Sequence, residues 1–218
     1  MNQLIHGVIK SVKFQMKIIA VGRNYHEHIQ ELKNETPEEP VLFLKPDTAL
    51  LKGGRDFYYP DFSSEIHYEV EVVLRICKEG KFVSKKFAQR YFDALTVGID
   101  FTARDIQAKQ KEKGLPWEIA KAFDGSAALG ELISTDQVED IHNMNFSLTI
   151  DGKQVQQDST ANMIHSFEDL ICYISKFFTL KKGDLIFTGT PAGVRPVTKG
   201  TKLQGFIESK ELLTCSIK

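Results

Sequence analysis

The sequence contains few cysteines, no long apolar run and no surplus of charge of one sign. Cys77, Cys172 and Cys215 are odd in number and widely spaced, so they indicate neither a disulfide framework nor a zinc knuckle. No apolar stretch approaches the roughly 18 residues of a membrane span, and residues 1–15 lack the sustained apolar segment of a secretory signal. We therefore expect a cytoplasmic protein with reduced thiols and no membrane partner.

The charge balance argues against a nucleic-acid partner. The 28 Lys and Arg residues nearly match the 29 Asp and Glu residues, and the formal net charge is −1. A chain of 218 residues is compatible with one domain, and its 42% hydrophobic content disfavours disorder. Because "MKIIAVGRNY", from Met16, resembles a natural start, we expect residues 1–15 to be an upstream extension and residues 16–218 to form a single domain.

Apolar periodicity predicts many short strands and a few short helices. Apolar runs predict strands at 17–21, 41–45, 95–100, 184–194, 201–207 and 211–217. Helical spacing predicts helices at 24–34 with Asn24 as cap, 86–94, 102–114 ending at Gly114, and 166–178 with Ser166 as cap. The clearest hairpin, 145–157, turns at Asp151-Gly152. Strands outnumber helices without strict alternation, which predicts a predominantly β, α+β fold rather than a doubly wound parallel sheet.

The stretch "SSEIHYEVEVVLRI", residues 63–76, carries acidic and basic groups on alternate positions. On a strand, Glu65, His67, Glu69 and Glu71 share one face. That face either meets water, as in many half-exposed strands, or builds a site. Glu69 and Glu71 are spaced to share a hard cation such as Mg²⁺. Asp100 closes an apolar strand, and a third carboxylate on the same cation would account for its burial.

Three weaker patterns add candidate catalytic groups. His28 and Glu31 are neighbours on the predicted helix and could act as a base and its orienting carboxylate, although such pairs are common on ordinary helices. Lys121 lies in an apolar-flanked segment, where the alternative is a surface lysine. The turn in "FTGTPAGV" could hold an anion through Thr188, Thr190 and backbone amides.

Seven segments together resemble the fumarylacetoacetate hydrolase family, and specifically its short, acylpyruvase-like branch. They occur in the family's order and at its spacing: "VGRNYHEHIQEL", "EPVLFLKP", "EIHYEVEVVL", "GIDFTARDIQ", "KGLPWEIAKAFDG", "MIHSFEDLICYIS" and "GDLIFTGTPAGV". The resemblance implies a mixed β-sandwich roll with a few short helices, a homodimer, and one catalytic domain over residues 16–218.

The resemblance also implies roles for individual residues. The family's Mg²⁺ or Mn²⁺ ligands correspond to Glu69, Glu71 and Asp100, its lid-helix dyad to His28 and Glu31, its active-site lysine to Lys121, and its substrate contacts to Arg23, Gln107 and Thr190. Tyr68 stands where close relatives carry His, but its side chain is expected to point away from the carboxylates.

The implied function is Mg²⁺-dependent cleavage of C–C bonds in small 2-oxo acids. Acylpyruvate hydrolysis and oxaloacetate decarboxylation both fit, through a metal-stabilised pyruvate enolate. The alternatives are an oxaloacetate tautomerase, a 2-hydroxyhepta-2,4-diene-1,7-dioate isomerase, and a non-catalytic metal- or ligand-binding β-domain. A nuclease of the Pro-Asp…Glu-x-Lys type is disfavoured because Glu71, not Lys, follows Glu69 by two residues.

Overall fold

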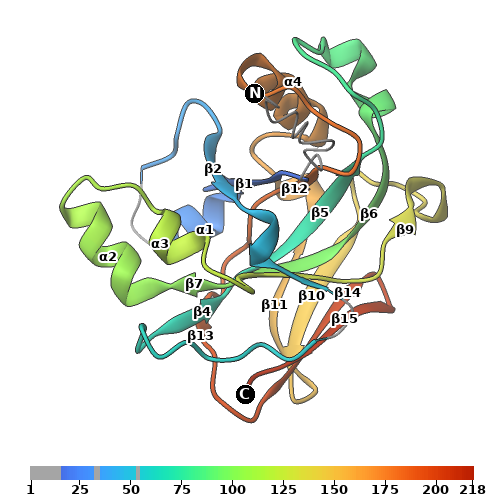
Figure 1. The fold of residues 1–218 in the computed structure, drawn as a ribbon. Helices are drawn as coiled ribbons and strands as arrows, with labels where there is room; N and C mark the ends of the chain where they lie inside the picture. Colours follow the sequence, from blue (N-terminus) through green and yellow to red (C-terminus); the bar gives the residue numbers. More distant parts are fainter. Residues whose placement is uncertain (1–15, 32–34, 53–54) are drawn as a thin grey trace, which may run out of the picture.

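The computed structural model describes residues 16–31, 35–52 and 55–218, so the predicted extension at residues 1–15 lies outside the described residues. Within these ranges the chain forms three β-sheets with short helices around them (Figure 1). Strands dominate and the pairing is mixed, which confirms the predicted α+β, predominantly β fold. Among the described residues, no helix is both long and apolar enough to cross a membrane.

The largest sheet has eight strands and carries Glu71 and Asp100, two of the residues predicted to be functional. Its strands are β1 (Ile18–Gly22), β2 (Val41–Lys45), β3 (Leu50–Lys52), β5 (Val70–Ile76), β6 (Phe92–Asp100), β8 (Ala127–Leu129), β9 (Ile133–Ser134) and β12 (Leu185–Phe187). β1 pairs in parallel with β12 and antiparallel with β2. β5 lies between β12 and β6, antiparallel to both, and is therefore a central strand.

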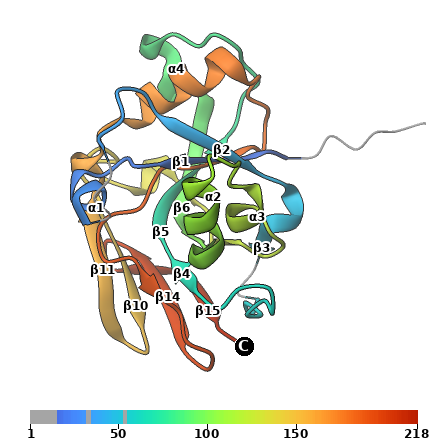
Figure 2. The same ribbon diagram turned by 90° about the vertical axis from the view of Figure 1, so that its left-hand side faces the viewer.

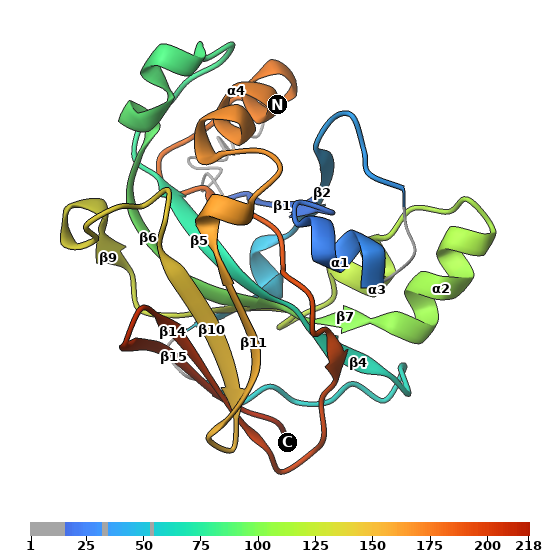
Figure 3. The same cartoon turned by 180° about the vertical axis from the view of Figure 1, so that it is seen from behind.

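Two smaller sheets complete the roll. The four-stranded sheet consists of β10 (Asn145–Ile150), β11 (Lys153–Ser159), β14 (Lys202–Ile207) and β15 (Lys210–Ser216), and the three-stranded sheet of β4 (Ile66–Tyr68), β7 (Thr102–Ala103) and β13 (Arg195–Pro196). β14 and β15 pack against β6, and β10 packs against β5 (Figure 3). The four-stranded sheet therefore covers one face of the larger one, as in a β-sandwich.

The helices are short and lie at the edges of the sheets. They are α1 (His26–Glu31), α2 (Arg104–Glu112), α3 (Glu118–Lys121) and α4 (Phe167–Phe177), with 3₁₀ helices η1 (Asp47–Ala49), η2 (Lys85–Tyr91), η3 (Thr135–Gln137) and η4 (Thr160–Asn162). α2 and α3 pack together, and α3 also contacts β2 and β7 (Figure 2). α4 packs against η2 at a distance from this pair (Figure 1).

The central strand β5 is buried on both of its faces. Val70, Val72 and Leu74 belong to the main hydrophobic core, whereas Val73 belongs to a second cluster that includes Phe187 of β12. Full burial of a Val or Leu side chain contributes about 1.5–3 kcal/mol, so this strand is held firmly in register. Glu71 on β5 therefore lies inside the protein, whereas Arg75 near the end of the strand reaches the surface and pairs with Asp93.

Several local predictions are confirmed. The hairpin of β10 and β11 turns at Asp151 and Gly152, whose φ angles of 49° and 78° suit a tight primed turn. The Ser166 hydroxyl caps α4 by accepting a hydrogen bond from the Asp169 N–H at 3.3 Å. Gly114 follows α2 with φ 63°, the left-handed conformation that commonly ends a helix.

The predicted helix at 86–94 is wrong in extent and type. Residues Lys85–Tyr91 form the 3₁₀ helix η2, and β6 begins at Phe92. Phe92 and Ala94 are buried and pair with β5, while Asp93 between them is exposed. This alternation is the pattern of a strand, and pairing with β5 prevails over the local helical spacing. The predicted strand at 184–194 is likewise shorter, since β12 spans only Leu185–Phe187.

Asn24 does not cap the helix that follows it. Its amide Nδ2 donates to the carbonyls of Thr188 and His165, at 2.8 and 3.1 Å, and its Oδ1 accepts from the His165 N–H at 2.8 Å. This fully buried side chain thus joins three distant segments instead of serving α1. The helix predicted at 24–34 is described as His26–Glu31, and residues 32–34 lie outside the described residues.

Candidate active site

Three carboxylates from neighbouring strands meet inside the protein. Glu69 lies at the break between β4 and β5, Glu71 lies on β5, and Asp100 is the last residue of β6. The Asp100 N–H donates to the Glu69 carbonyl at 2.8 Å, which places Asp100 beside the pair. One carboxylate oxygen from each residue lies within 4.8 Å of the other two, and the residues are 5%, 1% and 0% exposed. The fold therefore brings together the three residues predicted to bind a metal.

The alternative of a solvated strand face does not hold for Glu69 and Glu71. The beginning of this segment reaches the surface, where Glu65 is exposed and His67 is half-buried, and so does Arg75 near its end. The His67 Nε2 and Glu65 Oε1 atoms are 2.8 Å apart in a local pair. The two carboxylates further along are buried because β5 is a central strand covered on both faces.

Lys121 is buried beside two of the three carboxylates. Its ammonium donates to Glu69 Oε2 and Asp100 Oδ2, both at 2.7 Å, and to Thr102 Oγ1 at 2.6 Å. Although burial opposes it, the negative charges of Asp100 and Glu69 raise the pKa of Lys121, so the amine stays protonated. An ammonium has three N–H donors, and all three are used here, so Lys121 orients the two carboxylates and places a positive charge between them.

Two further cations hold the outer oxygens of the same carboxylates. Lys45, the last residue of β2, is fully buried and its Nζ lies 2.7 Å from Asp100 Oδ1. It also donates to the Ser126 hydroxyl at 3.1 Å. Arg104, the first residue of α2, donates from Nη2 to Glu69 Oε1 at 2.5 Å. Glu69 and Asp100 each form ion pairs with two cations.

Glu71 is the least compensated of the three carboxylates. Its Oε2 accepts a hydrogen bond from the Gly189 N–H at 2.7 Å, and among the described residues it has no cationic partner. Burial, together with the negative charges of Asp100 and Glu69, raises the pKa of Glu71 well above its usual range. A buried carboxylate in this position needs a further positive charge.

The donor set fits a hard divalent cation. Such a cation prefers a few carboxylate oxygens and completes its shell with water or substrate oxygens, and it would supply the charge that Glu71 lacks. The pKa of Glu69 is shifted in the opposite direction to that of Glu71. Although burial raises its pKa, the charges of Lys121 and Arg104 lower it well below the usual range, so Glu69 stays ionised without a metal.

The predicted dyad of His28 and Glu31 is present on α1 without a hydrogen bond between its members. The His28 Nδ1 and Glu31 Oε2 atoms are 4.0 Å apart, and His28 Nδ1 is buried without a partner among the described residues. Glu31 instead accepts from the Gly193 N–H at 2.9 Å and from the Arg195 guanidinium. Burial lowers the pKa of His28, so its imidazole is neutral at pH 7 and can accept a proton.

The three residues predicted to contact substrate lie around this centre. Gln107 is buried on α2, and its Oε1 accepts from Arg104 Nη1 at 2.6 Å. Thr190 is buried in the loop after β12, and its hydroxyl accepts from the Gln156 amide at 3.1 Å. Arg23 follows β1 in a left-handed conformation, φ 60°, which is unusual for a side chain of this size.

The geometry can be compared with that of known proteins. The sequence profile described as "Fumarylacetoacetate (FAA) hydrolase C-terminal" matches residues 17–218. The chain belongs to the fumarylacetoacetate hydrolase family. The family predicted from the seven segments is thereby confirmed, together with its fold.

Named relatives of this fumarylacetoacetate hydrolase family member are enzymes. The oxaloacetate tautomerase YcgM of Escherichia coli is 41% identical over 199 residues, which cover 91% of each chain. An oxaloacetate decarboxylase of Dictyostelium discoideum is 43% identical over 185 residues, 84% of this chain and 85% of the relative. The crystal structure of a fumarylpyruvate hydrolase from Pseudomonas aeruginosa, in complex with Mn²⁺ and pyruvate, superposes with a TM-score of 0.88 at 35% identity, covering 98% of this chain and 93% of that chain. The prediction of an enzyme is confirmed, and the names agree with the predicted chemistry of small 2-oxo acids.

Sequence reasoning missed several groups of this family site: Lys45, Thr102, Arg104, Gln156 and Arg195. Lys45 could have been predicted from the sequence. It closes the apolar run "VLFL", and a buried lysine without a partner is as costly as a buried Asp100. Arg195 carries none, since its partner Glu31 is far away in the chain.

Proposed function

We propose that this protein is a Mg²⁺-dependent enzyme that cleaves C–C bonds in small 2-oxo acids, by oxaloacetate decarboxylation, acylpyruvate hydrolysis or both. The observation that carries the proposal is the buried cluster of Glu69, Glu71 and Asp100, in which Lys121 bonds to Glu69 and Asp100 and whose charges act on the buried His28. The named relatives act on oxaloacetate or fumarylpyruvate, which belong to this class of substrate.

Glu69, Glu71 and Asp100 would hold the cation, whose charge would stabilise the negative charge that develops on a 2-oxo oxygen. Lys121 keeps Glu69 and Asp100 oriented before any substrate binds. Such preorganised charge is often the largest catalytic term, because no reorganisation is needed during the reaction. Lys45 and Arg104 keep the outer oxygens of the same carboxylates in place.

His28 supplies the proton-transfer group. Acylpyruvate hydrolysis needs a base to activate water at the C4 carbonyl, and the partner-free Nδ1 of a neutral imidazole can accept that proton. Glu31 is held by Gly193 and Arg195, so it fixes the end of α1. Its negative charge acts to raise the pKa of His28. Oxaloacetate decarboxylation needs no base, because the C4 carboxylate leaves as CO₂.

Tautomerisation of oxaloacetate is the second candidate function. It is favoured by the name of the Escherichia coli relative and by the same partner-free nitrogen of His28, which could move a proton at C3. The isomerisation of a heptadienedioate would use His28 in the same way. A non-catalytic binding domain is disfavoured, because the named relatives are enzymes.

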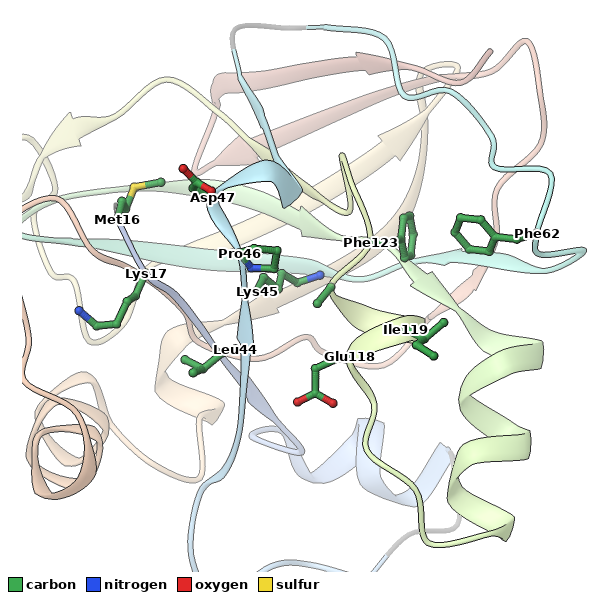
Figure 4. Close-up of a pocket in the computed structure, with 11 residues that line it drawn as sticks. Met16, Lys17, Leu44, Lys45, Pro46, Asp47, Phe62, Glu118, Ile119 and Phe123 are labelled. Atoms are coloured by element: carbon green, nitrogen blue, oxygen red, sulfur yellow. The ribbon is translucent and has the colours of Figure 1, made fainter. Parts of the chain in front are cut away.

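A homodimer completes the proposal. An apolar pocket of about 780 Å³ lies behind Lys45, away from the partner-free nitrogen of His28. Figure 4 shows Phe62, Ile119 and Phe123 on one side of it and Met16 and Leu44 on the other. Phe62 and Ile119 are 54% and 66% exposed, and apolar groups gathered around a pocket are typical of a protein interface. A second copy would bury them. The cytoplasmic location stays a prediction from the sequence.

The decisive experiment is one panel of assays on the purified protein. Oxaloacetate, acetylpyruvate and 2-hydroxyhepta-2,4-diene-1,7-dioate are each followed with Mg²⁺ and with EDTA, recording pyruvate release and loss of the enol absorbance separately. We expect Mg²⁺-dependent pyruvate release, and its loss in Glu71→Gln. Glu65→Gln, at the exposed start of the same segment, is the matched control and should stay active. Enol loss without pyruvate release would establish the tautomerase instead.

A further inference from the structure

Two cations at the rim of the candidate site lack acidic partners. Arg23 follows β1, and Lys111 lies in the last turn of α2. Among the described residues, neither side chain forms an ion pair with a carboxylate, whereas Arg104 nearby is paired with Glu69. The residues outside the described ranges contain no Asp or Glu, so the chain offers no further acid from there.

Lys111 faces the site and not the surrounding solvent alone. It lies seven residues after Arg104 and four after Gln107, so all three share one face of α2. Although Lys111 remains exposed, partial burial and then the positive charges of Arg104 and Arg23 lower its pKa to about 8. Charges that influence one another in this way lie close together. Two unpaired cations are therefore held near each other, and a bound anion would relieve the electrostatic repulsion between them.

Aromatic rings connect Lys111 to the carboxylate centre. The Lys111 Nζ lies 5.3 Å from the centre of the Trp117 ring, and the Trp117 ring meets Phe43 edge to face at 6.2 Å. The Phe43 ring in turn lies 5.2 Å from Lys121 Nζ. A side chain added at Gly22, the residue before Arg23, would touch both rings at 4.0 Å. The Trp117 and Phe43 rings thus link Lys111 to Lys121, and the backbone that leads into Arg23 runs beside both rings.

We propose that Arg23 and Lys111 bind the distal carboxylate of a dicarboxylic 2-oxo acid, and that they select such substrates over monocarboxylic acylpyruvates. The inference rests on the proposed function, because it assumes that the 2-oxo acid end of the substrate lies at the three buried carboxylates. The left-handed backbone of Arg23 supports it, since residues held in sparsely populated conformations cluster at ligand sites. Lys111 is then a specificity residue that the seven family segments do not include.

The test compares one substrate with a distal carboxylate and one without it, using oxaloacetate and acetylpyruvate. Lys111→Gln should raise KM for oxaloacetate by about 10-fold, with kcat and the KM for acetylpyruvate unchanged, because only uniform binding of the distal charge is lost. Lys111→Arg keeps the charge and should restore the KM. Lys109→Gln is the matched control, because Lys109 lies on the same helix two residues away and is exposed on another face.

The inference would be overturned if Lys111→Gln changed KM equally for the two substrates, or changed KM for neither of them. It would also be overturned if Lys109→Gln raised KM for oxaloacetate as much as Lys111→Gln does. Calorimetric binding of the unreactive pair 2-oxoglutarate and 2-oxobutyrate repeats the comparison without turnover. Selective loss of 2-oxoglutarate affinity in Lys111→Gln, in a protein that turns over no substrate, supports the inference and refutes the proposed function. Unchanged affinities for both compounds, in a protein that turns over both substrates, refute the inference and support the proposed function.

Discussion

Replacing Lys121 by Met should make the stability of the protein depend on Mg²⁺. Lys121 has the length of Met but adds an ammonium, which bonds to Glu69, Asp100 and Thr102 at 2.6–2.7 Å in a fully buried position. The substitution removes that charge and leaves three carboxylates within 4.8 Å of one another. The protein without metal then has to hold this negative charge with fewer cations.

The magnitude follows from the partners that remain. Removing one member of a buried ion pair costs about 3–5 kcal/mol. Lys45 still contacts Asp100 and Arg104 still bonds to Glu69, so we expect the lower end, about 3 kcal/mol. For a chain of this size, that corresponds to a fall in Tm of about 6–12 °C. Mg²⁺ at about 100 times its Kd stabilises a folded protein by about 2.7 kcal/mol, and in the variant it also relieves the repulsion. The native protein gains the same binding term, so only the relieved repulsion narrows the difference between variant and native protein, which should be smaller in Mg²⁺ than in EDTA.

Urea denaturation of both proteins, in EDTA and in excess Mg²⁺, measures the effect. Lys85→Met is the control, because Lys85 makes a similarly short ion pair with Asp169, at 2.6 Å, but on the surface. That control should not change stability measurably in either buffer. A Lys121→Met protein as stable as the native one in EDTA would refute the reasoning, and so would one that gains no more from Mg²⁺ than the native protein gains.

Three other predictions test the base and the interface. His28→Ala should lower acylpyruvate hydrolysis by about 10²–10⁴-fold and spare oxaloacetate decarboxylation, and parallel losses of both would refute a hydrolysis-only base. Because burial lowers the pKa of His28 below 6.5, native hydrolysis should persist somewhat below that pH and be lost as the pH falls through the lowered pKa. Ile119→Glu should convert a homodimer to a monomer in sedimentation analysis, whereas Phe82→Glu, at an equally exposed position away from the pocket, should leave the dimer intact. Dimers in both variants would exclude the pocket face as the interface.

The meeting of the three carboxylates could be predicted because its signals are local. Glu69 and Glu71 follow the period of a strand, and Asp100 ends an apolar run that has no other reason to close on an acid. The tight turn at Asp151-Gly152 is equally local, because its backbone conformation depends on those two residues. Where short-range rules decide the structure, the sequence was sufficient.

The remaining errors arise where distant segments meet. Asn24 has the composition of a helix cap, but its amide is taken by Thr188 and His165, far along the chain. Glu31 has the spacing of a partner for His28, but its carboxylate is bonded to the loop that carries Gly193. Neither competing partner is visible from spacing within one helix, because tertiary contacts determine which hydrogen bonds are made.

The parallel pairing of β1 with β12 has a consequence for how the protein is made. β1 finds its antiparallel neighbour β2 early, but its other edge pairs with Leu185–Phe187, near the end of the chain. At about 5–20 residues per second, a ribosome needs on the order of ten seconds to deliver that partner. Until then the apolar edge of Ile18–Gly22 is open to other chains. A nascent chain that stops before β12 carries Glu69, Glu71 and Asp100 but not the Gly189 N–H that holds Glu71. The site therefore cannot be completed until β12 and the loop after it have been synthesised.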